Sequence, residues 1–332
     1  VDAVSRAIAE ADLMATAVGA NILKFIAPNI AAGLKLRFRT SDAPLNIIIC
    51  ENLMDANKAL EKLIKAELTQ QEQAIFDERV GLVEASIGRM VPVQTPDMQD
   101  GDPLRVCVER YGYLPVDRDA FKGGIPPVRS LVPYSPFDFY IRRKLYIHNM
   151  GHAACAYLGL YTGKEFIYES IDDAETYAVV LNAMMESAEV LSQTYGIPLT
   201  DILRHIQDLL MRFTNKALRD TCKRVGGDPV RKLSPSDRLI GPARLCVQHG
   251  LTPAYICVGA AGAIYEYLKV NGREQTAENA AKALSELSGV EAGDPLQASI
   301  LSYYGLFAGG KSIAFIRRAA QKAKAAGNLD VV

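Results

Sequence analysis

The stretch Leu45-Asn-Ile-Ile-Ile-Cys-Glu-Asn52 decides the fold, because a nearly continuous apolar run ends abruptly in an acid and an amide. Such a run predicts a strand that is buried on both faces. A second run, Leu13-Met-Ala-Thr-Ala-Val18, lies upstream and ends at Gly19. Helical patterns precede, separate and follow the two runs. This order of elements predicts a parallel sheet covered on both faces.

Ligands of such sheets bind beyond the carboxyl ends of the strands. The sequence contains no Gly-x-Gly-x-x-Gly turn, so the first strand of a complete nucleotide-binding fold and its phosphate-binding turn would lie upstream of Val1. Our candidates for a nucleotide site are the residues at the two predicted strand ends: Thr16, Ala17, Val18, Gly19, Glu51 and Asn52.

The remainder of the chain changes character near Pro136. From about Val80 to Ser135, frequent prolines argue against long helices. The alternating stretches Val80–Ser86 and Leu104–Tyr111 in this region predict half-buried antiparallel strands. After Pro136, helical periods run through 137–162, 170–195, 198–213, 253–269, 276–288 and 313–326.

We therefore expect an α/β plus all-α chain with a domain boundary near residues 134–136. Residues 1–134 would be the remainder of a Rossmann-type parallel-sheet domain with appended antiparallel strands. Residues 135–332 would be a mainly helical domain that carries the catalytic groups.

Composition excludes several classes of protein. The net charge of −1 gives no bulk attraction to nucleic acid or to an anionic membrane. Six scattered cysteines, none in a Cys-x-x-Cys pair, indicate free thiols and give no zinc-site spacing. No apolar run approaches the roughly 20 residues that span a bilayer. We expect a cytoplasmic protein without metal, nucleic-acid or membrane partners, and a monomer as the default state.

Candidate chemistry concentrates in Lys144-Leu-Tyr-Ile-His-Asn-Met-Gly-His152, part of one long predicted helix. At about 100° per residue, Asn149 lies roughly 140° from Lys144, and His152 roughly 80°. The three side chains can converge on one side of the helix, where a base and two polar groups would bind a hydroxyl or a carbonyl. The alternative is a solvated face with one buried structural histidine.

Neighbouring residues of this helix have their own expected roles. Arg142 and Arg143, together with burial, would lower the pKa of the lysine from its ordinary value of about 10.4, as a useful base requires. His148 would pack or lie at the solvent edge, and Tyr157 would pack against the other domain. Gly151 would allow either the close approach of a ligand or tight helix packing.

The order of these features resembles the polyol-specific long-chain dehydrogenases. The likeness spans about residues 10 to 320 and is most specific in the Lys-x4-Asn-x2-His helix and in the stretch 224–242. The other stretches that carry it are Thr16–Gly19, Leu45–Asn52, Arg89-Met-Val-Pro92, Phe121-Lys-Gly123 and Arg212-Phe-Thr-Asn215.

This resemblance implies interconversion of mannitol 1-phosphate and fructose 6-phosphate with NAD(H), without a metal. Lys144 would be the general base, Asn149 and His152 would hold the reacting oxygen, and Asn52 would support the site from the sheet side. Thr16 and the residues after it would line the nicotinamide cleft, and the active site would lie between the two domains. The choice of NAD over NADP rests on the resemblance alone.

The basic stretch after Arg224 is the candidate site for the substrate phosphate, because guanidinium forks match phosphate oxygens. A solvated loop, with Asp228 and Asp237 as pairing partners, is the alternative. The candidate residues are Arg224, Arg231, Lys232 and Arg238.

One position departs from the pattern. The chain reads Ile87-Gly88-Arg89 where the resemblance leads us to expect Val-Asp-Arg. Glu84 would share a strand face with position 88 and could supply the missing carboxylate.

Two rival functions remain open. The chain could act on an unphosphorylated polyol or a sugar acid, such as mannitol, fructuronate or tagaturonate. It could also be a non-catalytic fragment that lacks the dinucleotide-binding turn.

Overall fold

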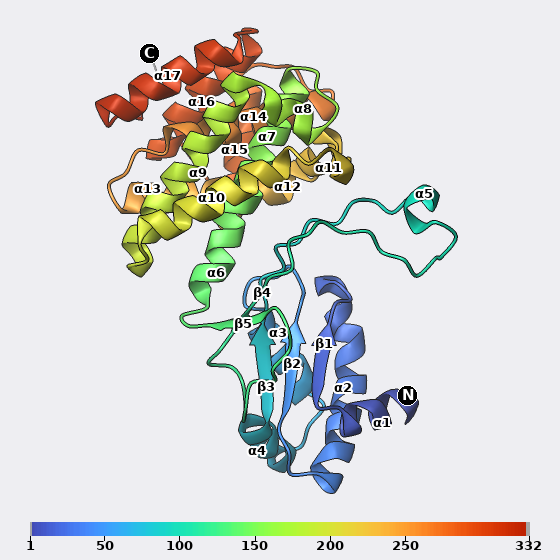
Figure 1. The fold of residues 1–332 in the computed structure, drawn as a ribbon. Helices are drawn as coiled ribbons and strands as arrows, with labels where there is room; N and C mark the ends of the chain where they lie inside the picture. Colours follow the sequence, from blue (N-terminus) through green and yellow to red (C-terminus); the bar gives the residue numbers. More distant parts are fainter. Residues whose placement is uncertain (1, 330–332) are drawn as a thin grey trace. The chain divides into compact units, whose positions relative to one another are not determined.

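The computed structural model describes residues 2–329 and divides the chain into two compact units (Figure 1). The first unit comprises residues 1–90 and 110–141, and the second comprises residues 91–109 and 142–332. The domain boundary that we expected near residues 134–136 stays a prediction. The sequence did not predict that residues 91–109 belong to the helical unit.

A three-stranded parallel sheet forms the centre of the first unit, as predicted. The strands β1 (Leu13–Thr16), β2 (Leu45–Ile49) and β3 (Val80–Glu84) lie in the order β1-β2-β3. Every residue of β2 is buried, which explains its continuous apolar pattern. The carboxyl ends of β1 and β2 lie at one edge of the sheet, since Thr16 pairs with Ile49.

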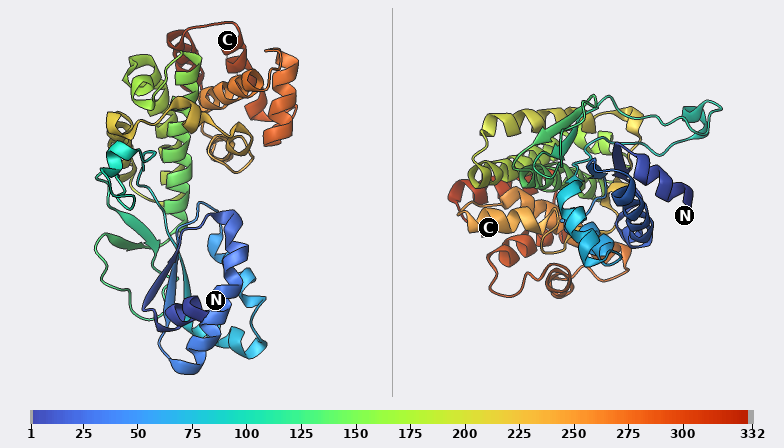
Figure 2. Two further views of the ribbon diagram at one scale, coloured as in Figure 1. Left: turned by 90° about the vertical axis from the view of Figure 1, so that its right-hand side faces the viewer. Right: turned by 90° about the horizontal axis from the view of Figure 1, so that it is seen from below.

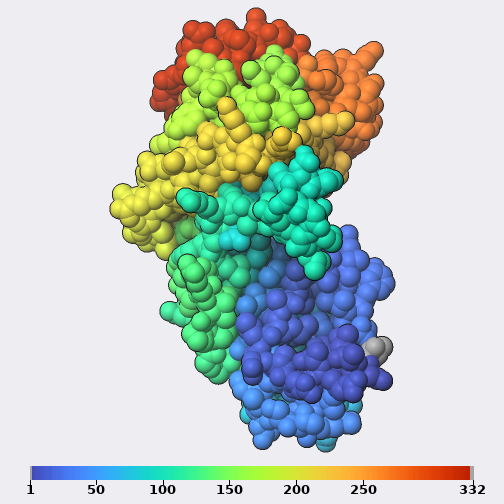
Figure 3. Space-filling model, turned by 45° about the vertical axis from the view of Figure 1, so that its right-hand side comes forward, coloured from blue at the N-terminus to red at the C-terminus, as the bar shows by residue number. Residues whose placement is uncertain are grey.

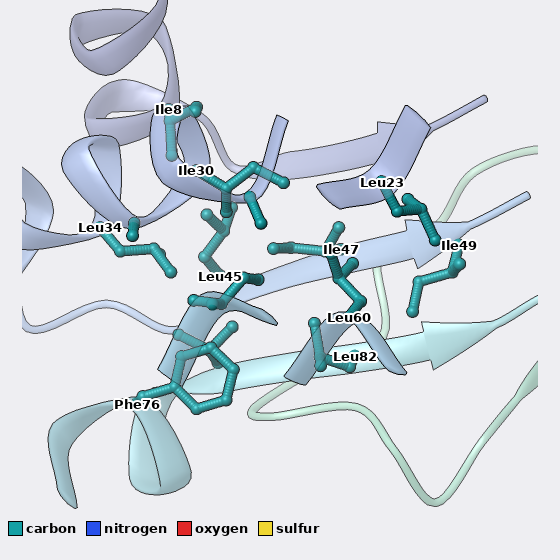
Figure 4. Close-up of a cluster of buried hydrophobic side chains, with 14 of the residues drawn as sticks. Ile8, Leu23, Ile30, Leu34, Leu45, Ile47, Ile49, Leu60, Phe76 and Leu82 are labelled. Carbon is teal, nitrogen blue, oxygen red and sulfur yellow. The ribbon is translucent and has the colours of Figure 1, made fainter. Parts of the chain in front are cut away.

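Helices cover one face of this sheet. They are α1 (Asp2–Glu10), α2 (Leu23–Thr40), which follows the short η1 (Ala20–Ile22), α3 (Ala56–Lys65) and α4 (Gln70–Arg79). Figure 4 shows Ile30 and Leu34 of α2 and Leu60 of α3 directed at Leu45 and Ile47 of β2. Burial of these side chains is the main favourable term that holds the layers together.

The opposite face is covered by a two-stranded ribbon rather than by helices. Its strands, β4 (Leu114–Asp117) and β5 (Leu131–Tyr134), place Val116 against Ile48 and Val83. Of the appended antiparallel strands that we expected, the structure has one isolated antiparallel bridge, between Ala85 and Val116, whereas β4 pairs with β5 in parallel and β3 pairs with β2 in parallel. The first four residues of β3 are all buried, so the strand does not alternate between buried and exposed positions. The apparent alternation in the sequence is caused by Gly81, which packs against Asn46.

The stretch Leu104–Tyr111 is not a strand, which corrects a second expectation. Residues 91–109 form a long excursion that contains only the short helix α5 (Pro96–Gln99), and Figure 3 shows this excursion in blue-green at the surface. Glu109 and Arg212 form a buried ion pair, in which Arg212 Nε donates to Glu109 Oε2 over 3.0 Å. A long-range contact of this kind leaves no local pattern in the sequence.

Helices make up most of the second unit (Figures 1 and 2). The predicted periods are confirmed by α7, α9, α10, α14, α15 and α17, whereas α16, of 14 residues, and several shorter helices were not predicted. The elements are α6 (Asp138–Arg143), η2 (Lys144–Asn149), α7 (Met150–Tyr161), α8 (Ile167–Asp172), α9 (Ala174–Tyr195), α10 (Leu199–Phe213), η3 (Lys216–Leu218), α11 (Cys222–Gly226), α12 (Pro229–Lys232), α13 (Ile240–Gln248), α14 (Ala254–Val270), α15 (Ala277–Ser288), α16 (Pro295–Ala308) and α17 (Ile313–Ala326). None of the helices within residues 2–329 has the length and apolar character needed to cross a membrane.

Two expectations about α7 are resolved by its packing. A Cβ atom at Gly151 would lie 2.7 Å from Met184 Sδ of α9, so this glycine serves tight helix packing. Tyr157 is buried within the helical unit itself, where its ring lies against Gly226 and Gly262. The expectation that Tyr157 packs against the other domain was therefore wrong.

Candidate active site

The predicted catalytic helix is not a uniform α-helix. Its residues Lys144–Asn149 form the π-helix η2, in which hydrogen bonds step five residues instead of four. Lys144 and Asn149, five residues apart, therefore lie one above the other, as residues four apart do in an α-helix. His152 follows Asn149 by three residues on α7 and shares its face. The π-helix therefore places Lys144 and Asn149 closer together around the helix axis than the expected 140° would.

Lys144 sits in surroundings that favour its neutral form. Burial, and after it the positive charge of Arg238, lowers the pKa of Lys144 to about 8. We had expected Arg142 and Arg143 to supply that charge. The positive charge comes from Arg238 instead, a residue 94 positions further along the chain.

His152 is held as a neutral ring on the same face. Its ring stacks on Phe213 of α10, with centroids 4.8 Å apart and planes inclined by 16°. Burial, and after it the charges of Arg224 and Arg238, lowers its pKa to about 3. Its Nε2 atom is buried and lacks a hydrogen-bond partner among residues 2–329. A buried nitrogen of this kind is available to a ligand.

Asp220 is a neighbour of this histidine that the sequence analysis missed. Its Oδ2 lies 3.5 Å from His152 Nε2, and its Oδ1 forms an ion pair with Arg224. Burial raises the pKa of Asp220, while Arg224 opposes that shift. The sequence offered a signal only in retrospect, since Asp220 lies four residues before Arg224.

The four candidate phosphate residues of the stretch 224–238 fall into two groups, one buried and one about half exposed. Lys232 and Arg238 are only 5% and 8% exposed. Arg238 Nε donates to Asp237 Oδ1 over 2.7 Å, whereas Lys232 has no ion pair with any of residues 2–329. Burial, and after it the charge of Arg238, lowers the pKa of Lys232 to about 8.

The remaining two cations are paired near the surface. Arg231 Nε contacts Asp228 Oδ2 at 2.8 Å, and both side chains are about half exposed. Asp228 also caps α12, so this pair belongs to the solvated-loop alternative. Arg224 is likewise half exposed and paired with Asp220. The structure therefore brings Arg238 into the electrostatic neighbourhood of Lys144, and both Lys232 and Arg238 into that of His152.

In the first unit, Glu51 organises the carboxyl edge of the sheet. The buried carboxylate accepts hydrogen bonds from the Thr16 hydroxyl, at 2.6 Å, and from the Val18 backbone N–H, at 3.0 Å. Thus Glu51 ties the turn after β1 to the end of β2. It does not cap the following helix, because the N-cap residue of α3 is Asp55.

The turn held by Glu51 leaves its other members accessible. Ala17, Val18 and Gly19 are exposed, and Gly19 has a φ angle of 91°. No atom lies within 4 Å of the position that a Cβ on Gly19 would occupy. Asn52 is exposed in the loop after β2. An accessible backbone at this edge suits a nucleotide, which binds at the carboxyl ends of parallel strands.

Glu84 does not replace the carboxylate missing at Gly88. Strand β3 ends at Glu84, so the two positions do not share a strand face as we expected. Glu84 Oε1 instead accepts a hydrogen bond from the Ala56 backbone N–H, at the first turn of α3, over 3.0 Å. Burial raises the pKa of this carboxyl, and the backbone donors oppose the shift.

Comparisons with known proteins agree with this architecture. Residues 1–130 match the model of the mannitol dehydrogenase Rossmann domain, and residues 137–318 match that of the mannitol dehydrogenase C-terminal domain. The chain belongs to the mannitol dehydrogenase family.

Within the family, the chain is similar to proteins named mannitol-1-phosphate 5-dehydrogenase. The protein of Bacillus subtilis (strain 168) is 36% identical over 304 residues, covering 89% of this chain and 78% of the relative. That of Brevibacillus brevis is 35% identical over 310 residues, covering 90% and 78%.

Two solved structures share the fold. Pseudomonas fluorescens mannitol 2-dehydrogenase, in a ternary complex with NAD and D-mannitol, aligns with a TM-score of 0.73 and 17% identity over 97% of this chain and 77% of that one. A D-sorbitol dehydrogenase in substrate-free form aligns with a TM-score of 0.77 and 15% identity over 95% and 77%. The predicted combination of a parallel-sheet domain and a helical domain is confirmed.

Proposed function

We propose that this protein interconverts mannitol 1-phosphate and fructose 6-phosphate with NAD(H). The observation that carries the proposal is the set of groups on η2 and α7, where a half-buried lysine with a pKa of about 8 shares a helix face with an amide and a neutral imidazole. The names of the relatives support the choice of substrate.

In this proposal Lys144 is the general acid and base. A lysine with its ordinary pKa of about 10.4 is protonated near neutral pH and is a poor base. At a pKa of about 8, a useful fraction is neutral and can take the hydroxyl proton of the alcohol. In the reverse direction, protonated Lys144 returns that proton to the carbonyl oxygen.

Asn149 and His152 hold the reacting oxygen. The amide of Asn149 and a ring N–H of His152 are donors, and they stabilise the negative charge that develops as the proton leaves. Because His152 is neutral, it can act as a donor without adding a charge that would compete with Lys144. We assign Asn52 a supporting role from the sheet side.

The edge of the sheet would hold NAD, which supplies the hydride acceptor when it is bound. Thr16 and Glu51 fix the turn, and the exposed backbone of Ala17, Val18 and Gly19 would lie against the nucleotide. In this arrangement Glu51 acts as the residue that sets the shape of the turn.

For the substrate phosphate we propose Lys232 and Arg238. Both are buried, and both lie close enough to affect the electrostatics of the catalytic face. A dianionic phosphate would compensate the positive charge gathered there, and charge-assisted hydrogen bonds would fix its orientation. We assign Arg224 and Arg231 lesser roles, because both side chains are about half exposed at the surface.

The test follows NADH consumption by the full-length enzyme with fructose 6-phosphate and, separately, with fructose. We expect efficient turnover of the phosphate ester only, and a loss of about 10²-fold or more in kcat for Lys144→Ala. Comparable turnover of fructose would move the function to an unphosphorylated polyol. Undiminished activity of Lys144→Ala would remove the proposed base.

A further inference from the structure

The first unit contains a cavity that the proposed function does not use. Its volume is about 860 Å³, and it is lined by residues of three segments, 87–89, 110–114 and 128–131. All three segments belong to the first unit, so the cavity is defined within that unit alone.

Three arginines line this cavity: Arg89, Arg110 and Arg129. None of its lining residues is an aspartate or a glutamate. Within residues 2–329, none of the three guanidinium groups takes part in an ion pair, although many other arginines of the chain do. Three positive charges therefore line the cavity, and no carboxylate of the lining compensates them.

Backbone contacts position two of these arginines. Arg89 Nε donates to the backbone oxygen of Tyr111. Arg129 occupies a tight turn, in which the Leu131 N–H donates to Val128 O over 3.1 Å. Ser130, the next residue of that turn, has a φ angle of 68°, a strained conformation for a residue with a side chain. Its carbonyl accepts from the Leu114 N–H over 2.9 Å, which ties the turn to β4.

Gly88 adds no charge to the lining. A Cβ atom at this position would lie 3.3 Å from the ring of Tyr111, so a small side chain could be accommodated with a slight shift. An aspartate here would place a carboxylate among the arginines and pair with them. With glycine, the electrostatic field of the cavity favours anions.

We propose that this cavity binds a phosphate monoester group. Guanidinium forks donate pairs of parallel hydrogen bonds to phosphate oxygens, and a dianion can engage more than one fork at once. Because Lys232 and Arg238 are the proposed site of the substrate phosphate, the phosphate bound in this cavity would belong to a separate effector molecule. Binding in the cavity itself goes beyond the proposed function and does not depend on Lys144, Lys232 or Arg238.

The experiment is a calorimetric titration of the full-length protein with inorganic phosphate. In the double variant Arg110→Gln, Arg129→Gln we expect the Kd to rise tenfold or more, because two of the three positive charges that line the cavity are lost. Both side chains are exposed, so the fold should tolerate the two changes. Arg39→Gln, which removes one arginine charge on the exposed part of α2, should leave the Kd unaltered.

A second pair of variants isolates charge from shape. Gly88→Asp and Gly88→Asn add side chains of nearly equal size, and only the aspartate should weaken phosphate binding. Equal Kd values for Asp and Asn, or for the wild type and the double arginine variant, would overturn the proposal. So would a wild-type protein to which phosphate does not bind.

Steady-state kinetics identify the source of the phosphate. The double variant should lose phosphate binding while its KM for fructose 6-phosphate stays the same. A raised KM would show that the cavity holds the substrate phosphate, and would overturn its assignment to an effector. A wild type that binds phosphate here but does not reduce fructose 6-phosphate would contradict the proposed function and leave this inference intact.

Discussion

At the scale of single residues, the pKa of Lys144 determines how the activity should respond to pH. Oxidation needs the neutral amine, so kcat/KM for mannitol 1-phosphate should rise as the pH passes through about 8 and level off above it. Reduction needs the protonated amine, so kcat/KM for fructose 6-phosphate should fall over the same interval. Measured pH profiles in both directions check this.

Arg238→Gln tests the cause of that pKa. Removing the positive charge should move the rising limb of the oxidation profile to higher pH, toward the ordinary value for lysine of about 10.4. Arg231→Gln is the matched control, because it removes a charge from the same loop at an exposed, paired position. A limb that moves equally in both variants would contradict the assignment.

Lys232 should discriminate between phosphorylated and unphosphorylated substrates. Loss of a charge-assisted hydrogen bond is worth about 1.5–3 kcal/mol, so Lys232→Gln should raise KM for fructose 6-phosphate about tenfold or more. The slow turnover of fructose, which has no phosphate, should change little. Equal losses with the two substrates, measured by initial rates, would argue for a purely structural lysine.

The residue types of the site could be predicted from the sequence, but their electrostatic partners could not. Lys144, Asn149 and His152 stand out because polar groups are rare on an apolar helix. Asp220 directly precedes α11, which packs on α7, and Arg238 lies in the segment between α12 and α13; a linear pattern does not encode either approach. Glu51 was noticed for its position, whereas its role as a link to Thr16 required coordinates.

At the scale of elements, the junction between α9 and α14 offers a test of stability. The buried Glu186 of α9 accepts hydrogen bonds from the backbone N–H groups of Tyr255, at 3.1 Å, and Ile256, at 3.0 Å, in the first turn of α14. Glu186→Ala would leave these donors buried without a partner, and should lower the free energy of unfolding by about 2–4 kcal/mol.

Urea denaturation measures this effect, and two variants control it. Glu186→Gln keeps an oxygen acceptor and should cost less than the alanine variant. Glu189→Ala removes a carboxylate of the same helix that pairs with Lys324 nearer the surface, and should cost about 1 kcal/mol or less. A similar cost for Glu186→Ala and Glu189→Ala would show that the first turn of α14 does not need its acceptor.

Elements were predictable where periodicity is strong and misjudged where it is weak. The long helices α9, α10 and α14 follow their apolar periods closely. The π-helix η2 was missed because a helix with one widened turn has nearly the same pattern as an ordinary one. Strand β3 was assigned to the wrong class because Gly81, which fits against Asn46, interrupts its apolar run.

At the scale of the whole molecule, residues 91–109 are joined to the helical unit by the buried pair of Glu109 and Arg212. Removing one partner of a buried pair costs about 3–5 kcal/mol, and here the cost should appear as local detachment of the segment. Glu109→Gln should therefore make the exposed Arg105 a fast tryptic site. Mass spectrometry of timed digests detects the cleavage.

A variant within the same segment serves as the control. Asp100→Asn removes the exposed partner of Arg105 and leaves the anchor in place, so it should not increase cleavage as Glu109→Gln does. If both variants are cut at the same rate as the wild type, the ion pair does not hold the segment.

The π-helix η2 also bears on the ancestry of the site. A helical turn of this type contains one residue more than the α-helical turn it replaces, so a single inserted codon can create it. Before such an insertion, the lysine and the amide would have stood four positions apart on an unbroken α-helix, with the same side chains stacked. Distant relatives that carry Lys-x3-Asn in place of Lys-x4-Asn could therefore present the same pair of groups, and a search for the longer spacing would overlook them.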